Sequence, residues 1–143
     1  MGRIKIDLPD HFIFQTFIPI RISDVNYGGH LGNDSILSLV HEARIQFLKQ
    51  YDCKELDVYG VGLIMSDAAI EFKQEAFYND ILKIEVAIHG FSRVGFDLYY
   101  KLSKQRESKE TVIAIVKTGM ICYDYDRKKV VSVPEKFKEH FIS

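Results

Sequence analysis

Apolar and polar side chains alternate through most of the second half of the chain. Four segments show this period of two: residues 63–77, 80–91, 95–104 and 111–125. Such alternation is typical of β-strands that bury one face, so each segment is predicted to be a strand. Turn-forming or charged residues fill the connections between them, at 78–80, 92–95 and 104–110.

The first half of the chain predicts one strand and one long helix. Residues 12–22 are rich in aromatic and β-branched side chains, and Pro19 favours a sheet edge or a bulge. In residues 33–51 apolar side chains recur at helical spacing, and Asn33 or Asp34 can cap the first turn. The apolar face is broad and consists of Ile36, Leu39, Val40, Ala43 and Phe47, widened by Leu37 and Leu48. Because of this breadth, we expect other structure to wrap around the helix.

The order of these elements indicates the fold class. A strand, a long helix and four further strands predict an α+β protein with an antiparallel sheet of about five strands. Pro134 is expected to open a short terminal helix over 134–141, as proline often does. A length of 143 residues suits a single domain over 1–143.

Composition and charge exclude several classes of protein. Hydrophobic residues make up 47% and charged residues 27% of the chain, as in soluble globular proteins, and the net charge of −1 gives no reason to expect nucleic acid as a partner. No run approaches the roughly 20 apolar residues of a membrane helix, and the N-terminus lacks the apolar core of a signal peptide. Cys53 and Cys122 have no metal-binding spacing and favour a reducing compartment. A cytoplasmic protein without membrane partners is therefore predicted.

The richest chemistry lies in one loop, Ser23 to Asp34, just before the long helix. Its polar side chains belong to Asp24, Asn26, His30, Asn33 and Asp34, and its glycines are Gly28, Gly29 and Gly32. Glycine lets backbone amides approach a ligand closely, and the first amides of a helix are unpaired at the positive end of its dipole. The loop is predicted to hold a carbonyl oxygen that becomes negative during a reaction.

The stretch from Ile20 to Arg44 resembles the signature of the hotdog-fold acyl-CoA thioesterases of the 4-hydroxybenzoyl-CoA thioesterase group. The matching positions are Arg21, Asp24, Gly29, His30, Asn33, Glu42, Ala43 and Arg44. The resemblance continues through residues 70–88, 118–125 and 133–134. It implies a hotdog fold, in which the sheet wraps the central helix, and hydrolysis of an acyl-CoA thioester. It also implies association as a dimer or tetramer, with coenzyme A present only as part of the substrate.

One position departs from that signature. The catalytic carboxylate usual in the group is the second Asp of a D-x-D motif, and Asn26 stands there in this chain. An amide can neither take a proton from water nor attack as a nucleophile, but it can orient water or bond to a thioester oxygen. Another group must then activate the water.

Three residues are therefore predicted to be catalytic: Asn26, His30 and Glu42. Histidine ordinarily changes its charge near neutral pH, and His30 lies beside the expected carbonyl site. Glu42 lies on the helix stripe of Ser35 and Ser38, where it either acts as a base or forms a salt bridge to Arg44 or a lysine. Substrate contacts are predicted for the loop residues Asp24, Gly28, Gly29 and Asn33, with Asp24 also expected to hold the loop through backbone amides.

Further contacts with the substrate are predicted on the strands. By the resemblance, Ile64, Met65 and Ser66 belong to a strand that pairs across the dimer and lines the acyl tunnel. Arg93 could meet a coenzyme A phosphate with its forked guanidinium group. The alternatives are core packing for the first three residues and a solvated turn for Arg93. No metal site is predicted.

Two other functions remain open at this level. A hotdog dehydratase or hydratase would pair a histidine with Asp or Glu, although the "LGND" that follows His30 does not match that branch. A non-catalytic module that binds acyl-CoA or an acyl carrier is favoured by Asn26. Free thiol as the product would indicate hydrolysis. A hydroxyacyl thioester as the product would indicate hydration, and binding without thiol release would indicate a binding module.

Overall fold

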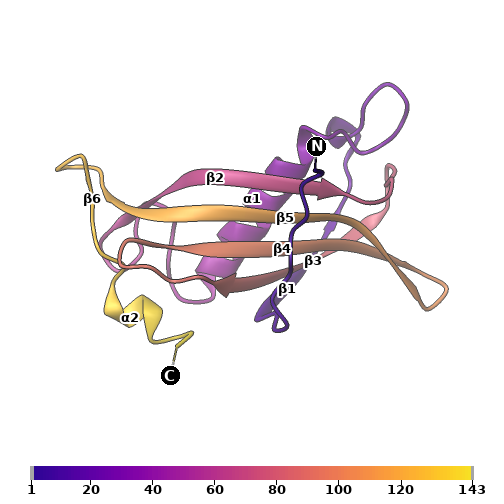
Figure 1. Cartoon of the computed structure of the whole chain (residues 1–143). Helices are drawn as coiled ribbons and strands as arrows, with labels where there is room; N and C mark the ends of the chain where they lie inside the picture. Colours follow the sequence, from indigo (N-terminus) through magenta and orange to yellow (C-terminus); the bar gives the residue numbers. More distant parts are fainter. Residues whose placement is uncertain (1, 143) are drawn as a thin grey trace.

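The computed structural model describes residues 2–142 and shows an antiparallel sheet beside one long helix (Figure 1). Its strands are β1 (Phe14–Pro19), β2 (Gly62–Phe72), β3 (Ile81–His89), β4 (Gly95–Arg106), β5 (Lys109–Asp124) and β6 (Lys129–Val130). The helices are η1 (Ile22–Asp24, a 3-10 turn), α1 (Ser35–Lys49) and α2 (Glu135–Lys138). Five long strands follow the order β1-β3-β4-β5-β2, and the short β6 pairs with β5, so the sheet has one small strand more than predicted.

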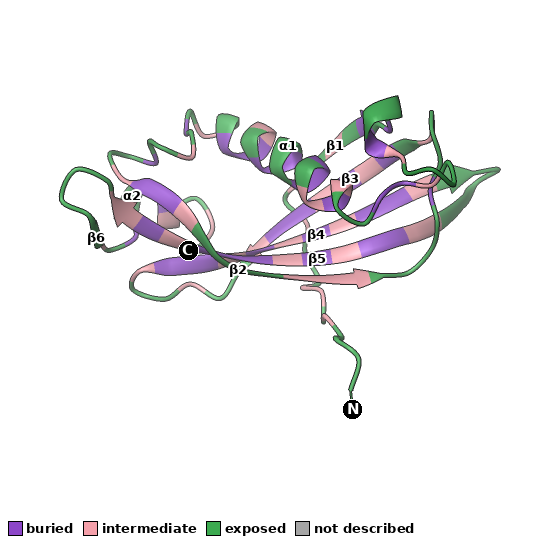
Figure 2. Ribbon diagram, turned by 90° about the horizontal axis from the view of Figure 1, so that it is seen from above, coloured by how far each residue is buried: buried purple, intermediate pink, exposed green. Residues whose placement is uncertain are grey.

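The sheet curves beneath α1, as Figure 2 shows, and the core lies between them. All seven apolar residues predicted for the helix face are buried except Leu37, which is partly buried. On the sheet, alternate residues of β4 point at the helix: Phe96, Leu98, Tyr100 and Leu102 are buried. The segment before β1 crosses the opposite face of the sheet, where the amide of Ile6 donates to Glu71 on β2. Period-two and helical patterning therefore place the core as predicted.

Element boundaries differ from the predictions at their ends. The first strand stops at Pro19, because the chain then bends into η1, where the Asp24 carboxylate accepts a hydrogen bond from the amide of Arg21 at 2.8 Å. The long helix begins at Ser35, and Asp34 precedes it with helical backbone angles and no side-chain cap bond. The predicted cap by Asn33 or Asp34 is therefore wrong. Only Glu135–Lys138 of the predicted terminal helix is helical, with Pro134 at its cap position.

A series of hydrogen bonds between largely buried side chains joins α1 to the sheet. Arg44 is 6% exposed; its Nε donates to Glu55 Oε2 at 2.7 Å and its Nη1 to the hydroxyl of Tyr100 at 3.2 Å. The Tyr100 hydroxyl also bonds to Thr118 Oγ1 at 2.8 Å. Burial raises the pKa of Tyr100. This chain of bonds fixes the rotation of α1 on the sheet, because a buried guanidinium must keep its partners.

No helix in the described part of the chain is both long enough and apolar enough to cross a membrane.

Candidate functional site

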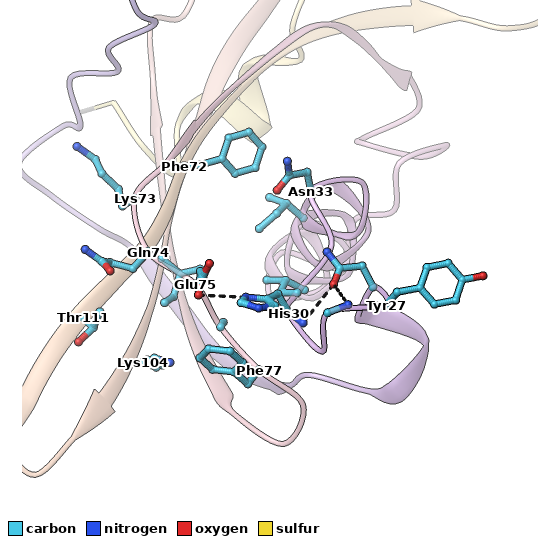
Figure 3. A pocket seen from close by; sticks show the side chains of 16 residues that line it. Tyr27, His30, Asn33, Phe72, Lys73, Gln74, Glu75, Phe77, Lys104 and Thr111 are labelled. Atoms are coloured by element: carbon cyan, nitrogen blue, oxygen red, sulfur yellow. Dashed lines mark hydrogen bonds and ion pairs between the residues drawn. The ribbon is translucent and has the colours of Figure 1, made fainter.

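A cavity of about 1090 Å³ opens beside the start of α1. Its walls come from three parts of the chain: the loop 26–33, the segment 72–77 at the end of β2, and the β4–β5 hairpin (Figure 3). The floor is apolar, with Ile36 and Ile113 each 3% exposed. Phe72 and Phe77 add aromatic surface, whereas Tyr27 points away from the other side chains and is fully exposed. The cavity thus combines an apolar base with polar groups from the loop.

Backbone pairing holds the loop against the segment after β2. Leu31 donates its amide to the carbonyl of Ala76 at 2.7 Å, and His30 forms an isolated antiparallel bridge with Phe77. Asp24 is 3% exposed, and its carbonyl oxygen accepts a bond from Gly32 at 2.9 Å. Asp24 therefore organises the loop from beneath and does not line the cavity.

Asn26 is oriented by the loop's own backbone. Its side-chain oxygen, Oδ1, accepts hydrogen bonds from the amides of Gly28 at 3.0 Å and His30 at 3.3 Å. Its own amide donates to the carbonyl of His30 at 2.8 Å. An Asn side chain has one acceptor oxygen and one NH₂ donor group, so Nδ2 is the group that Asn26 can offer to a ligand.

The loop glycines do not offer free amides in this conformation. The amide of Gly28 donates to Asn26 Oδ1, that of Gly29 to the Asn26 carbonyl at 3.0 Å, and that of Gly32 to Asp24. The expectation that Gly28 and Gly29 amides bind a substrate oxygen is wrong for this loop, because the turn uses them to close itself. Gly29 is needed for its positive φ of 79°, which other residues rarely adopt.

Other donors remain at the start of α1. Asn33 is exposed, lines the cavity, and its backbone N–H makes no hydrogen bond to any described residue. Amides at this end of a helix carry the positive end of the dipole. The Asn33 amide and Asn26 Nδ2 are thus the candidate donors for a carbonyl oxygen.

His30 meets a carboxylate that the sequence did not point to. Its Nδ1 lies 3.1 Å from Glu75 Oε2, and its ring centroid lies 5.0 Å from that of Phe77 (Figure 3). Both side chains reach solvent, at 36% exposure for His30 and 68% for Glu75. A Cβ built on Gly28 would lie 3.0 Å from His30 Cδ2 and 3.4 Å from Asn26 Oδ1, so Asn26 and His30 converge at this glycine.

Two lysines of the cavity wall are already paired. Lys104 Nζ lies 2.9 Å from Asp80 and 5.0 Å from the Phe77 ring centroid, and Lys73 Nζ lies 2.7 Å from Glu71. Although burial opposes it, the hydrogen bonds from Lys104 and from the Phe77 amide hold the pKa of Asp80 below its ordinary value. The positive charge at this wall is therefore largely compensated.

Glu42 lies apart from this cavity. It accepts a bond from Gln46 at 2.8 Å and lines a separate hollow of about 350 Å³ between α1 and β1. The alternative of a salt bridge from Glu42 to Arg44 is wrong, because Arg44 pairs with Glu55 instead. Within a single chain, Glu42 does not meet His30.

The residues predicted on the strands also lie away from the cavity of one chain. Ile64, Met65 and Ser66 belong to the first half of β2, whereas the cavity begins at Phe72 at its far end, about 20 Å along a strand. Arg93 lies in the turn between β3 and β4 and donates to Ser132 at 3.4 Å. The structure thus brings Asn26, Gly28, His30 and Asn33 together at the cavity. It places the predicted residues of the helix, β2 and the β3–β4 turn away from it.

Sequence reasoning missed the segment that faces the loop, including Glu75 and Phe77. No local motif marks these residues, since they belong to the alternating pattern of a predicted strand. Their place in the site follows from the pairing of His30 with Phe77, a contact between distant parts of the chain.

Comparisons with known proteins agree with this architecture. A 1,4-dihydroxy-2-naphthoyl-CoA hydrolase from Microcystis aeruginosa is 27% identical over 122 residues, which cover 83% of this chain and 86% of that protein. A solved 1,4-dihydroxy-2-naphthoyl-CoA thioesterase from Synechocystis superposes with a TM-score of 0.77 at 20% identity, over 87% of this chain and 92% of the other. A 4-hydroxybenzoyl-CoA thioesterase variant in complex with 4-hydroxybenzoyl-CoA gives a TM-score of 0.80 at 17% identity, over 88% and 96%.

These structural similarities confirm the predicted hotdog fold. The predicted thioesterase class is confirmed by the family to which the chain belongs. The family model described as the thioesterase-like superfamily matches residues 20–141. A match over that span means that this chain belongs to the thioesterase-like superfamily.

Proposed function

We propose that the protein is an acyl-CoA thioesterase that cleaves its substrate in the cavity beside the start of α1. The observation that carries this proposal is the convergence of Asn26 and His30 at Gly28, in a cavity of about 1090 Å³. A space of this size, apolar at its base, suits an acyl group with part of the pantetheine arm. The relatives named as acyl-CoA hydrolases support the same substrate class.

The side chains of the site suggest how the reaction proceeds. The thioester carbonyl oxygen accepts hydrogen bonds from Asn26 Nδ2 and from the Asn33 amide, which stabilise the negative charge that develops on it. His30 Nε2 takes a proton from a water molecule, and the water oxygen attacks the carbonyl carbon. The tetrahedral intermediate then collapses, the C–S bond breaks, and the coenzyme A thiolate takes the proton from the imidazolium. The products are a free acid and coenzyme A.

Aromatic acyl groups are the first substrates to test. Phe72 and Phe77 line the cavity, and stacking between aromatic rings adds to the free energy gained from burial. The relatives above are named for naphthoyl and benzoyl thioesters. We therefore include hydroxyaryl acyl-CoAs beside short and long aliphatic ones.

Self-association through β2 is part of the proposal. This strand lies at the edge of the sheet and pairs only with β5 among the described residues, and Met65 to Ala68 are exposed on it. Met65 is 46% exposed, and an exposed strand edge is a template for pairing with a second chain. A Met65→Lys variant should shift the mass measured by light scattering from dimer or tetramer to monomer. A monomeric wild-type protein would contradict the proposed self-association through β2.

A thiol-release screen tests the activity itself. Purified protein is mixed with benzoyl, hydroxybenzoyl, hydroxynaphthoyl, acetyl and palmitoyl coenzyme A, and free thiol and acid are measured. Saturable release of both products from at least one thioester is expected. Tight binding without release would indicate a binding module, and a hydroxyacyl thioester as product would indicate a hydratase; either result overturns the proposal.

A further inference from the structure

Glu75 occupies a position that the fold determines closely. It lies between β2 and β3, directly before Ala76 and Phe77, and both of these neighbours are paired with the loop through Leu31 and His30. Ala76 is 1% exposed, so this short stretch is anchored against the loop. The pairing brings the Glu75 side chain to His30.

The imidazole of His30 is confined on three sides. Glu75 Oε2 lies 3.1 Å from Nδ1, the Phe77 ring lies against one face, and Gly28 leaves no room for a side chain beside Cδ2. Nε2 makes no hydrogen bond to any of residues 2–142, and it is the ring nitrogen opposite the carboxylate. The ring therefore has one nitrogen that faces a carboxylate and one that is available to the cavity.

The lysines of the cavity wall pair with carboxylates other than Glu75. Lys73 is paired with Glu71 and Lys104 with Asp80, each at less than 3 Å. The charged or titratable side chains that line the cavity beside His30 are thus Glu75 and these two compensated lysines, together with Tyr27, which points away. Glu75 is the carboxylate in position to act on the imidazole.

We infer that Glu75 is a positioning residue for His30, an inference that rests on the proposed function. An ionised carboxylate only accepts hydrogen bonds, so its approach to within 3.1 Å of Nδ1 favours the proton on that nitrogen. The lone pair of the neutral ring then lies on Nε2, on the side where water is to be activated. Glu75 also stabilises the imidazolium formed in that step. It thereby supplies a carboxylate to a site where Asn26 provides none.

The exposure of Glu75 separates this role from a structural one. Glu75 is 68% exposed, and an ion pair open to solvent contributes little to folding stability. Replacing Glu75 should therefore leave the fold intact. Its effect should appear in the chemical step and in the tautomer of His30.

Kinetics of Glu75→Gln, Glu75→Asp and the matched control Glu110→Gln test the inference. Glu110 also belongs to an ion pair, with Lys101 at 3.2 Å, but it does not line the cavity. Glu75→Gln should lower kcat roughly 10- to 100-fold, a smaller loss than removal of a general base causes. KM should change less than about twofold. Glu75→Asp should recover part of the loss, and Glu110→Gln should match the wild type.

A double variant gives a readout that a structural role would not move. In a His30→Ala background, Glu75→Gln should cause no further loss, because the two residues act as one unit. A kcat of Glu75→Gln within twofold of the wild type, or the same loss in both backgrounds, would overturn the inference.

Nitrogen-15 NMR of histidine-labelled protein separates failure of this inference from failure of the proposed function. The wild type should show His30 protonated at Nδ1 when neutral, and Glu75→Gln should show a mixture of tautomers. This measurement needs no turnover. An Nε2-protonated ring in the wild type would overturn the inference even if thioesters are cleaved, whereas an Nδ1-protonated ring would support it even if no tested thioester is cleaved.

Discussion

The backbone amide of Leu31 donates a 2.7 Å hydrogen bond to the carbonyl oxygen of Ala76. This bond joins the glycine-rich loop to the end of β2, two parts of the chain that lie far apart in sequence. His30 directly precedes Leu31 and Glu75 directly precedes Ala76, and the side chains of these two residues meet. The candidate site is therefore built by strand-like pairing of a loop, and its geometry should depend on small residues that permit close approach.

Gly28→Ala should impair turnover without unfolding the protein. The added Cβ would lie 3.0 Å from His30 Cδ2, so the imidazole must shift by a few tenths of an ångström. We expect kcat to fall about tenfold, because small misplacements of reacting groups have large effects on rate. Gly2→Ala, where a Cβ meets no atom within 4 Å, is the control. Wild-type kcat in Gly28→Ala would contradict the placement of His30.

Asn26→Asp tests whether this position acts as an amide that donates to the substrate oxygen or as a catalytic carboxylate. A carboxylate can accept the same bonds from the Gly28 and His30 amides, so the melting temperature should change by less than about 3 °C. The Nδ2 donor is lost, however, and an acceptor faces the substrate oxygen instead. We expect kcat to fall at least about tenfold. A rise in kcat would show that a carboxylate at this position is the better catalytic group.

The ion pair beneath α1 should make stability depend on pH. Although burial alone would raise it, the hydrogen bonds from Arg44 and His41 hold the pKa of Glu55 below its ordinary value. A carboxyl group with a lowered folded-state pKa stabilises the protein above its unfolded-state pKa of about 4.3, and this contribution is lost as pH falls through the folded-state value. Glu55→Gln should reduce the unfolding free energy by about 2 kcal/mol at pH 7, and the difference from wild type should shrink toward pH 3.

Urea unfolding of both proteins between pH 3 and pH 7 measures this difference. Glu107→Gln, at the exposed tip of the β4–β5 hairpin, is the control and should follow the wild type at every pH. A constant difference between Glu55→Gln and wild type across this range would refute the linkage.

The cysteines should be inert in the folded protein. Cys122 is fully buried, and burial raises the pKa of its thiol to about 11. Burial also raises the pKa of Cys53. Alkylation by iodoacetamide at pH 8, followed by mass spectrometry, should be at least about 100-fold slower in the native protein than in urea, because the thiolate is the reacting form. Rapid native labelling of Cys122 would show that the core opens far more often than its burial indicates.

Secondary structure could be predicted from the sequence because its signals are local. The period of two placed β5 at 111–125, and the structure has it at Lys109–Asp124. The broad apolar face of α1 likewise predicted its burial. Arg44 was not predicted to be buried, because its partners Glu55 and Tyr100 come from other elements. Such pairings depend on tertiary contacts that periodicity does not encode.

The same distinction applies to the site. Asn26, His30 and Asn33 are close in sequence, so their common location could be predicted from one loop. Glu75 could not, since it joins the loop only through the register that pairs His30 with Phe77. The loop amides were predicted to be free, but hydrogen bonds within the turn use those of Gly28 and Gly29. Glycine content alone does not say which amides a turn consumes.

Turnover of His30→Ala tests most directly whether His30 activates water in the cavity beside α1. With the best acyl-CoA from the screen, kcat should fall roughly 10²- to 10⁴-fold, the contribution expected of a general base, while the melting temperature stays within a few degrees of the wild type. If kcat of His30→Ala remains within twofold of the wild type, water is activated elsewhere and the cavity beside α1 is not the catalytic centre.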